Sequence, residues 1–149
     1  MPTIFIDADA CPVKEDTFRI AKRYSLKVVV VSNHKKEVPK ENWISSVEVE
    51  KRFDAVDDWI ESNIQAKDIV LTNDILLADR CIKKNAHPID PRGKIYTENN
   101  IGEALATREL MSELRQRGAL DLGPKQMGKK HRSNFLSSLD LLINRVLKL

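Results

Sequence analysis

Cysteine and aromatic residues are scarce in this chain of 149 residues, which has two cysteines and only 5% Phe, Trp and Tyr. Two distant cysteines exclude a disulfide framework and a zinc site, which needs more ligands at closer spacing. So few aromatic residues do not support a platform for stacking nucleic-acid bases. No apolar run reaches the length of a membrane span, and the N-terminus lacks the basic-then-apolar pattern of a signal peptide. We therefore expect a cytoplasmic protein with no membrane partner.

The charged residues, which make up 32% of the chain, are unevenly distributed along it, although the formal net charge is only +3. Acidic residues cluster early in the sequence. The basic excess comes late, at Arg108, Arg115, Arg117, Lys125, Lys129, Lys130 and Arg132. This asymmetry suits a polyanionic substrate that basic residues hold and an acidic, metal-loaded centre cuts. A solvated, helix-rich surface would explain it equally well.

Apolar patterning alternates strands with helices, and 42% hydrophobic residues are enough for one domain with a real core. Strands are predicted from residue 3, at 27–32, 68–73 and 87–90, with a short one at 47–49. Helices are predicted over 13–25, 54–65, 74–84, 101–117 and 133–149, and a connector over 120–130. The order predicts an α/β fold, a three-layer α/β/α sandwich with a mainly parallel central sheet and C-terminal helices. The last helix packs on the domain or on a second copy, which would allow a homodimer.

Two carboxylates, Asp7 and Asp9, directly follow the first predicted strand. Ligands of open α/β sheets bind at this end of the strands, and crowded carboxylates repel unless they share a cation or keep a proton. Asp57 falls in the first turn of the middle helix, and Asp74 follows the strand at 68–73. If the strands are parallel neighbours, these acids can hold Mg²⁺ or Mn²⁺. Such an ion would activate water and stabilise a phosphoryl group under attack.

Each acid also has a structural interpretation. Asp54 and Asp74 are suitable helix N-caps, and Asp57 can complement the helix dipole. Asp7 is the hardest to explain in this way, because it ends an apolar strand with Asp9 beside it. Nearby polar and basic residues are candidates for contact with a substrate: Asn33, Thr72, Asn73, Arg92 and Arg132.

Six segments carry a family resemblance: Asp7–Pro12, Phe53–Asp57, Asp68–Ala78, Pro91–Gly93, Gly123-Pro124 and His131–Phe135. In this order, over almost the whole chain, they resemble the YaiI/YqxD family of uncharacterised bacterial proteins. That family resembles PIN-like domains, three-layer α/β/α folds of which many are metal-dependent ribonucleases. The resemblance implies a single PIN-like domain over 1–149, with 97–149 as a helical extension packed on it. It matches Asp7, Asp57 and Asp74 to the metal-binding acids.

The chain departs from the PIN-like pattern after Asp74, where many such sites have a further acid. Apolar residues follow here instead, and Asp9 would take that role. The resemblance thus implies a divalent-metal-dependent nuclease acting on RNA, with Asp7, Asp9, Asp57 and Asp74 as catalytic acids and Mg²⁺ or Mn²⁺ as cofactor.

Two alternatives use the same residues. The first is a resemblance to haloacid-dehalogenase-like phosphatases, in which Asp7 is the nucleophile and Asp9 the general acid/base. Ser32 would then contact phosphate, and Asp74 and Asp79 would bind the metal. The chain is short for that superfamily and lacks its usual Gly-Thr after the second aspartate. The other alternative is a non-catalytic RNA-binding or regulatory module that keeps the acids for stability.

Overall fold

The computed structural model describes residues 1–9, 11, 14–118 and 129–149. Its centre is a five-stranded sheet in the order β3-β2-β1-β4-β5, and all neighbouring strands are parallel. The strands are β1 (Thr3–Asp7), β2 (Lys27–Ser32), β3 (Ile44–Glu48), β4 (Ile69–Leu71) and β5 (His87–Ile89). The prediction of a mainly parallel sheet is confirmed. The prediction for β3 was wrong in its bounds, because this strand begins at Ile44 and not at position 47.

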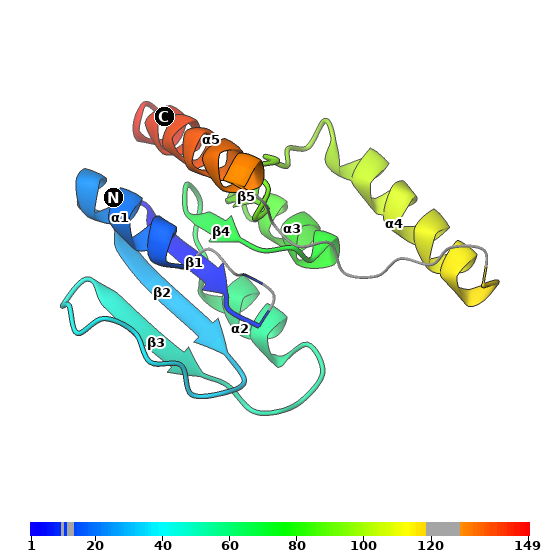
Figure 1. Ribbon diagram of the computed structural model, residues 1–149, viewed down its shortest axis with the longest axis horizontal. Helices are drawn as coiled ribbons and strands as arrows, with labels where there is room; N and C mark the ends of the chain where they lie inside the picture. The colour runs from blue at the N-terminus through cyan, green and yellow to red at the C-terminus, as the bar shows by residue number, and fades with distance from the viewer. Residues whose placement is uncertain (10, 12–13, 119–128) are drawn as a thin grey trace.

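Helices cover both faces of the sheet and complete the predicted three-layer sandwich (Figure 1). On one face lie α1 (Lys14–Tyr24) and α5 (Lys129–Leu147), and on the other α2 (Ala55–Asn63) and α3 (Ile75–Ile82). The first part of α4 (Ile101–Gln116) packs on α3, and the rest of α4 projects away from the sheet. None of the described helices has both the length and the apolar character needed to cross a membrane.

The alternation of side chains along β1 divides the core in two. Ile4 and Ile6 pack with α1 and α5, whereas Phe5 packs with α2 and α3. The apolar stripe of α5 is buried on the sheet of its own chain, with Phe135 and Ile143 both 0% exposed. Each such side chain stabilises the fold by about 1.5–3 kcal/mol. The stripe therefore gives no argument for a homodimer, which stays a prediction.

Two of the sequence motifs meet at the turn that follows β5. Gly93 has φ +97°, and a Cβ added to it would lie 2.8 Å from the carbonyl oxygen of Asn134 in α5. Only glycine fits this turn, because it combines a left-handed backbone with close contact to a helix. The contact brings the turn that carries Arg92 and the start of α5 to the carboxyl edge of the sheet. The predicted connector over 120–130 contains Gly123-Pro124. Its residues 120–128 lie outside the described part of the chain.

Candidate functional site

The order of the strands creates a switch point between β1 and β4. From β1 the chain continues through β2 and β3 on one side, while β4 and β5 lie on the other. In open parallel sheets, ligands bind beyond the carboxyl ends of the strands at such a point. Here β1 ends at Asp7, and β4 is followed by Thr72, Asn73 and Asp74. Asp7 and Asp74 therefore emerge next to each other, as the sequence predicts.

A buried threonine connects Asp7 with Asp74. The Thr72 Oγ1 donates a hydrogen bond to Asp7 Oδ2 at 2.9 Å and accepts one from the Asp74 backbone N–H at 3.0 Å. Asp7 is 5% exposed and Thr72 is 1% exposed. Thr72 was predicted to contact a substrate, but the structure places it as an interior residue that orients the two acids. Its buried position was not evident from the sequence.

Asp57 completes a group of three acids. It lies in the first turn of α2, is 9% exposed, and shares a hydrogen bond with Asp74. Asp74 is the N-cap of α3, where its Oδ1 accepts the N–H of Leu76 at 2.9 Å. The amino ends of α2 and α3 both lie at this group, where helix dipoles favour negative charge. The acid cluster, defined here as Asp7, Asp57 and Asp74, thus brings together the three predicted metal ligands.

No basic side chain in the described part of the chain is paired with the acid cluster. Burial, followed by repulsion from Asp74 and Asp9, raises the pKa of Asp7 from 3.8 to about 6, although the Thr72 hydrogen bond acts in the opposite direction. Burial, followed by repulsion from Asp74 and Asp7, raises the pKa of Asp57 to about 7. A cation would therefore stabilise the ionised carboxylates.

Asp9, which follows β1, borders the acid cluster, and Asn33, which follows β2, lies beside Asp9. Asp9 accepts hydrogen bonds from Ser32 Oγ at 2.6 Å and from the Asn33 backbone N–H at 3.2 Å. The side-chain Oδ1 of Asn33 is buried and has no hydrogen-bond partner within the described part of the chain. Such an unpaired buried oxygen is unfavourable, and an amide oxygen is a ligand that hard divalent cations accept. Asn33, predicted to bind substrate, thus adds a further oxygen beside Asp9.

The donor set fits Mg²⁺ or Mn²⁺, since all its atoms are hard oxygens. Among the described residues, the structure has no group of three His, Cys, Asp or Glu side chains that encloses a position for a metal ion. Mg²⁺ does not need such an enclosure, because it keeps several waters and commonly takes one or two carboxylates. The acid cluster therefore offers enough ligands for a partly hydrated ion.

The other predicted contact residues lie around the acid cluster without joining it. Asn73 and Arg92 are exposed at the same sheet edge. Arg132 is paired with Asp16 in the first turn of α1, at 3.2 Å, and the Asp16 side chain is only 4% exposed. Arg132 therefore holds α5 against α1 through its charge. Lys125, which belongs to the late basic excess, lies outside the described residues.

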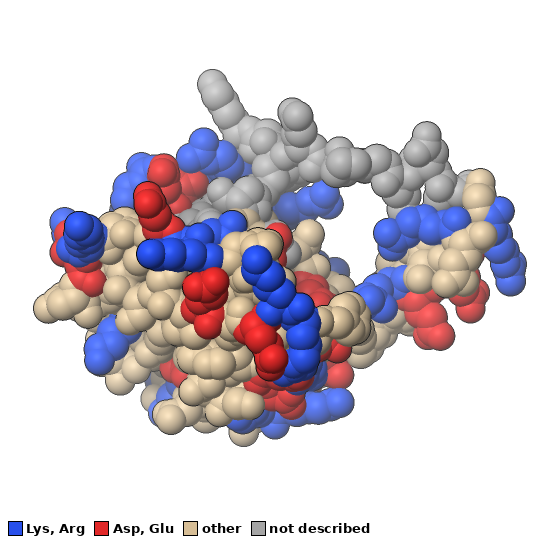
Figure 2. All heavy atoms as spheres, turned by 90° about the horizontal axis from the view of Figure 1, so that it is seen from below, with Lys and Arg blue, Asp and Glu red and all other residues tan. Residues whose placement is uncertain are grey.

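Two basic side chains, Lys94 and Arg108, and the acidic Glu103 lie on the α4 side of α3. With Ile75, which directly follows Asp74, they line a hollow of about 280 Å³. Figure 2 shows basic and acidic side chains mixed both on the projecting helix α4 and on the body of the molecule. Arg108, which belongs to the late basic excess, lines this hollow, and a role of that excess in holding a substrate stays a prediction.

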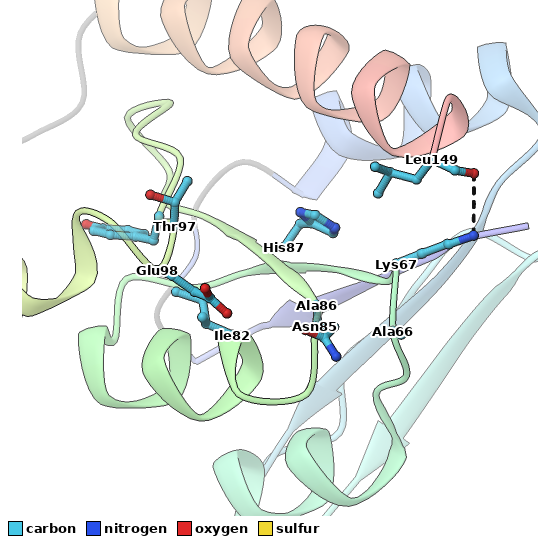
Figure 3. A pocket seen from close by; sticks show the side chains of 10 residues that line it. Ala66, Lys67, Ile82, Asn85, Ala86, His87, Thr97, Glu98 and Leu149 are labelled. Atoms are coloured by element: carbon cyan, nitrogen blue, oxygen red, sulfur yellow. Dashed lines mark hydrogen bonds between the residues drawn. The ribbon is translucent and has the colours of Figure 1, made fainter.

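A larger cavity, of about 430 Å³, lies at the opposite edge of the sheet (Figure 3). It is lined by residues that precede β4 and β5, by the segment before α4 and by Leu149, whose carbonyl accepts a hydrogen bond from Lys67 Nζ at 3.4 Å. Burial lowers the pKa of its His87, which favours the neutral imidazole. This cavity contains no member of the acid cluster, so the two places are distinct.

Comparison with known proteins agrees with the resemblance seen in the sequence. A family model described as "Uncharacterized BCR, YaiI/YqxD family" matches residues 5–145. A UPF0178 protein of Rhodospirillum centenum is 47% identical over 150 residues, which cover 98% of this chain and 97% of that protein. A UPF0178 protein of Azorhizobium caulinodans is 46% identical over 144 residues, covering 97% of this chain and 91% of that protein. No solved structure matches the chain.

Proposed function

The chain belongs to the YaiI/YqxD family, and we propose that it is a divalent-metal-dependent ribonuclease whose acid cluster binds Mg²⁺ or Mn²⁺. One observation carries the proposal. Three acids from β1, α2 and the end of β4 meet at the switch point of the sheet, and two of them have pKa values raised to about 6 and about 7. Groups with such shifts, collected at a ligand-binding edge, are typical of functional sites.

The roles of the residues follow from their positions. Asp7 and Asp74 would hold the ion, with Thr72 fixing their orientation through its two hydrogen bonds. Asp57 would add negative charge from α2, and Asp9 would lie at the substrate side, since it is exposed. When bound, the ion would supply a water of lowered pKa and would offset charge on the phosphoryl group.

A nucleic-acid substrate also needs positive charge beside the acids, because the acid cluster alone repels phosphates. Lys94 and Arg108, which line the hollow that includes Ile75, and Arg92, which is exposed in the turn after β5, would supply this charge. Contacts of this kind position the backbone of a nucleic acid without reading its sequence. They favour a polymer over a small phosphate ester, since they extend beyond the acid cluster.

The structure gives less support to the two alternatives. The phosphatase alternative requires Asp79 as a metal ligand, but Asp79 is paired with Lys83 at 3.1 Å on α3. The non-catalytic alternative keeps the acids for stability, yet the raised pKa values of Asp7 and Asp57 mean that their ionised forms destabilise the fold. Acids that destabilise a fold are more readily explained by a function.

The first test is incubation of the purified protein with a labelled single-stranded RNA at about pH 8, where the acid cluster is ionised. We expect the RNA to be shortened with Mg²⁺ or Mn²⁺ and to stay intact with EDTA. A small phosphate ester is the comparison substrate, and we expect no turnover of it. Intact RNA with both metals, or faster turnover of the ester, would contradict the proposal.

A further inference from the structure

Phe53 is unusual among the aromatic residues of the described chain. It is 90% exposed, whereas every other aromatic side chain is buried or half-buried. The scarcity of aromatic residues makes this position conspicuous, since burial is the ordinary use of such a side chain. Phe53 lies in the loop between β3 and α2, directly before the helix that carries Asp57.

The loop that presents Phe53 is firmly organised. Arg52 donates hydrogen bonds to Glu50 at 3.0 Å, to Asp58 at 2.9 Å and to the carbonyl oxygen of Phe53 at 3.3 Å. Asp54 has a left-handed backbone with φ 62°, which is uncommon for a residue other than glycine. Asp54 was predicted to cap α2, and it occupies that position, but its side chain makes no capping hydrogen bond. The turn is thus held in shape while the ring that it carries remains in solvent.

The turn also lies beside the acid cluster. Phe53 precedes the first residue of α2, Ala55, by two residues, and Asp57 lies in the first turn of that helix. The carboxylate of Asp54, between them, is close enough to act on the charge of Asp57. The loop that carries Phe53 therefore flanks the acid cluster on its α2 side.

We propose that Phe53 is a stacking platform for an unpaired base, and that the substrate is single-stranded RNA. This inference rests on the proposed function. Every base has a flat face that can stack on an aromatic ring, so the contact is tolerant of sequence. Bases within a duplex are already paired and stacked, so they cannot reach the ring. Phe53 would thus select unpaired strands, while the metal-loaded acid cluster holds the phosphate.

The test measures binding of a short fluorescent single-stranded RNA by anisotropy with Ca²⁺ present, which takes the same kind of oxygen ligands, and a gel checks that the strand stays intact. An abasic strand of the same length provides the phosphates without the bases. We expect Phe53→Ala to weaken binding of the RNA by about 5- to 100-fold, the range measured for stacking of one base. Binding of the abasic strand should not change. Phe53→Trp should retain the affinity, because it keeps an aromatic face.

Leu141→Ala is the matched control, because Leu141 is an exposed apolar residue on α5, 48% exposed and away from the acid cluster. We expect it to bind both strands like the wild type. Phe53→Ala is expected to fold, since the ring makes no core contact, and circular dichroism checks this. If Phe53→Ala binds RNA like the wild type while the wild type still cleaves RNA with metal, the stacking inference fails and the proposed function survives. If the wild type neither binds nor cleaves RNA, both fail.

Discussion

Replacing Asp7 with asparagine is expected to reduce RNA cleavage at least about 100-fold, because a metal ligand is lost. The same change should stabilise the protein at about pH 8. The shift of the Asp7 pKa from 3.8 to about 6 means that its ionised form costs about 3 kcal/mol in the native state. Asparagine removes the charge and can still accept the hydrogen bond of Thr72. Cleavage assays and chemical denaturation at about pH 8 measure the two effects.

Asp68→Asn is the control for this prediction, because Asp68 is also buried but lies outside the acid cluster. Its carboxylate accepts the backbone N–H groups of Thr3 and Gln65, both at 2.9 Å. Asparagine cannot accept both in the same way, so we expect this variant to lose stability and to keep its cleavage activity. If Asp7→Asn is destabilised to a similar degree, Asp7 is a structural residue and the repulsion within the acid cluster is not significant.

The stability of the metal-free protein is expected to fall as the pH rises from about 4 to about 7. The pKa values of Asp7 and Asp57 in the native state, about 6 and about 7, both exceed the ordinary value of 3.8. In this window the native state therefore holds protons that the unfolded chain has lost. Stability that is present below pH 3.8 is then lost as each native carboxyl ionises. For Asp7 alone the loss is about 3 kcal/mol.

Other titrating groups also contribute to the pH profile, so the measurement is a difference. The free energy of unfolding is determined in EDTA for the wild type and for the Asp7→Asn, Asp57→Asn double variant. We expect the variant to be increasingly more stable than the wild type as the pH rises, with a constant difference above about pH 8. A difference in the free energy of unfolding that does not change with pH would show that Asp7 and Asp57 titrate with ordinary pKa values.

The positions of Asp7 and Asp74 could be predicted from the sequence because they depend on local patterns. Each follows a short apolar run that predicts a buried strand, and parallel strands place their carboxyl ends at one edge. Asp57 was found by its place in the first turn of a helix. The strand at Ile44 was missed at its start because Ile44, Ser45 and Ser46 lack strong alternation, and pairing with β2 decides it.

The features of the site that sequence reasoning missed depend on tertiary structure. The burial of Thr72 and the unpaired Oδ1 of Asn33 come from packing around the ends of β1 and β2. Phe53 was missed for a different reason. The amino-acid composition gives only the number of aromatic residues, whereas stacking depends on whether a single ring is exposed and held in place. The polar, charged loop around Phe53 was the available signal, since it offers no apolar partner to bury the ring.

The claim on which the function depends is that Asp7, Asp57 and Asp74 share one divalent ion. Crystals soaked in Mn²⁺ at about pH 8, where the carboxyls are ionised, test it through anomalous scattering. We expect one strong anomalous peak within coordination distance of Asp7 and Asp74, at about 2.0–2.2 Å from their oxygens. The peak should be absent from crystals of Asp7→Asn. A peak elsewhere, or none at these carboxylates, would contradict the assignment of a metal centre.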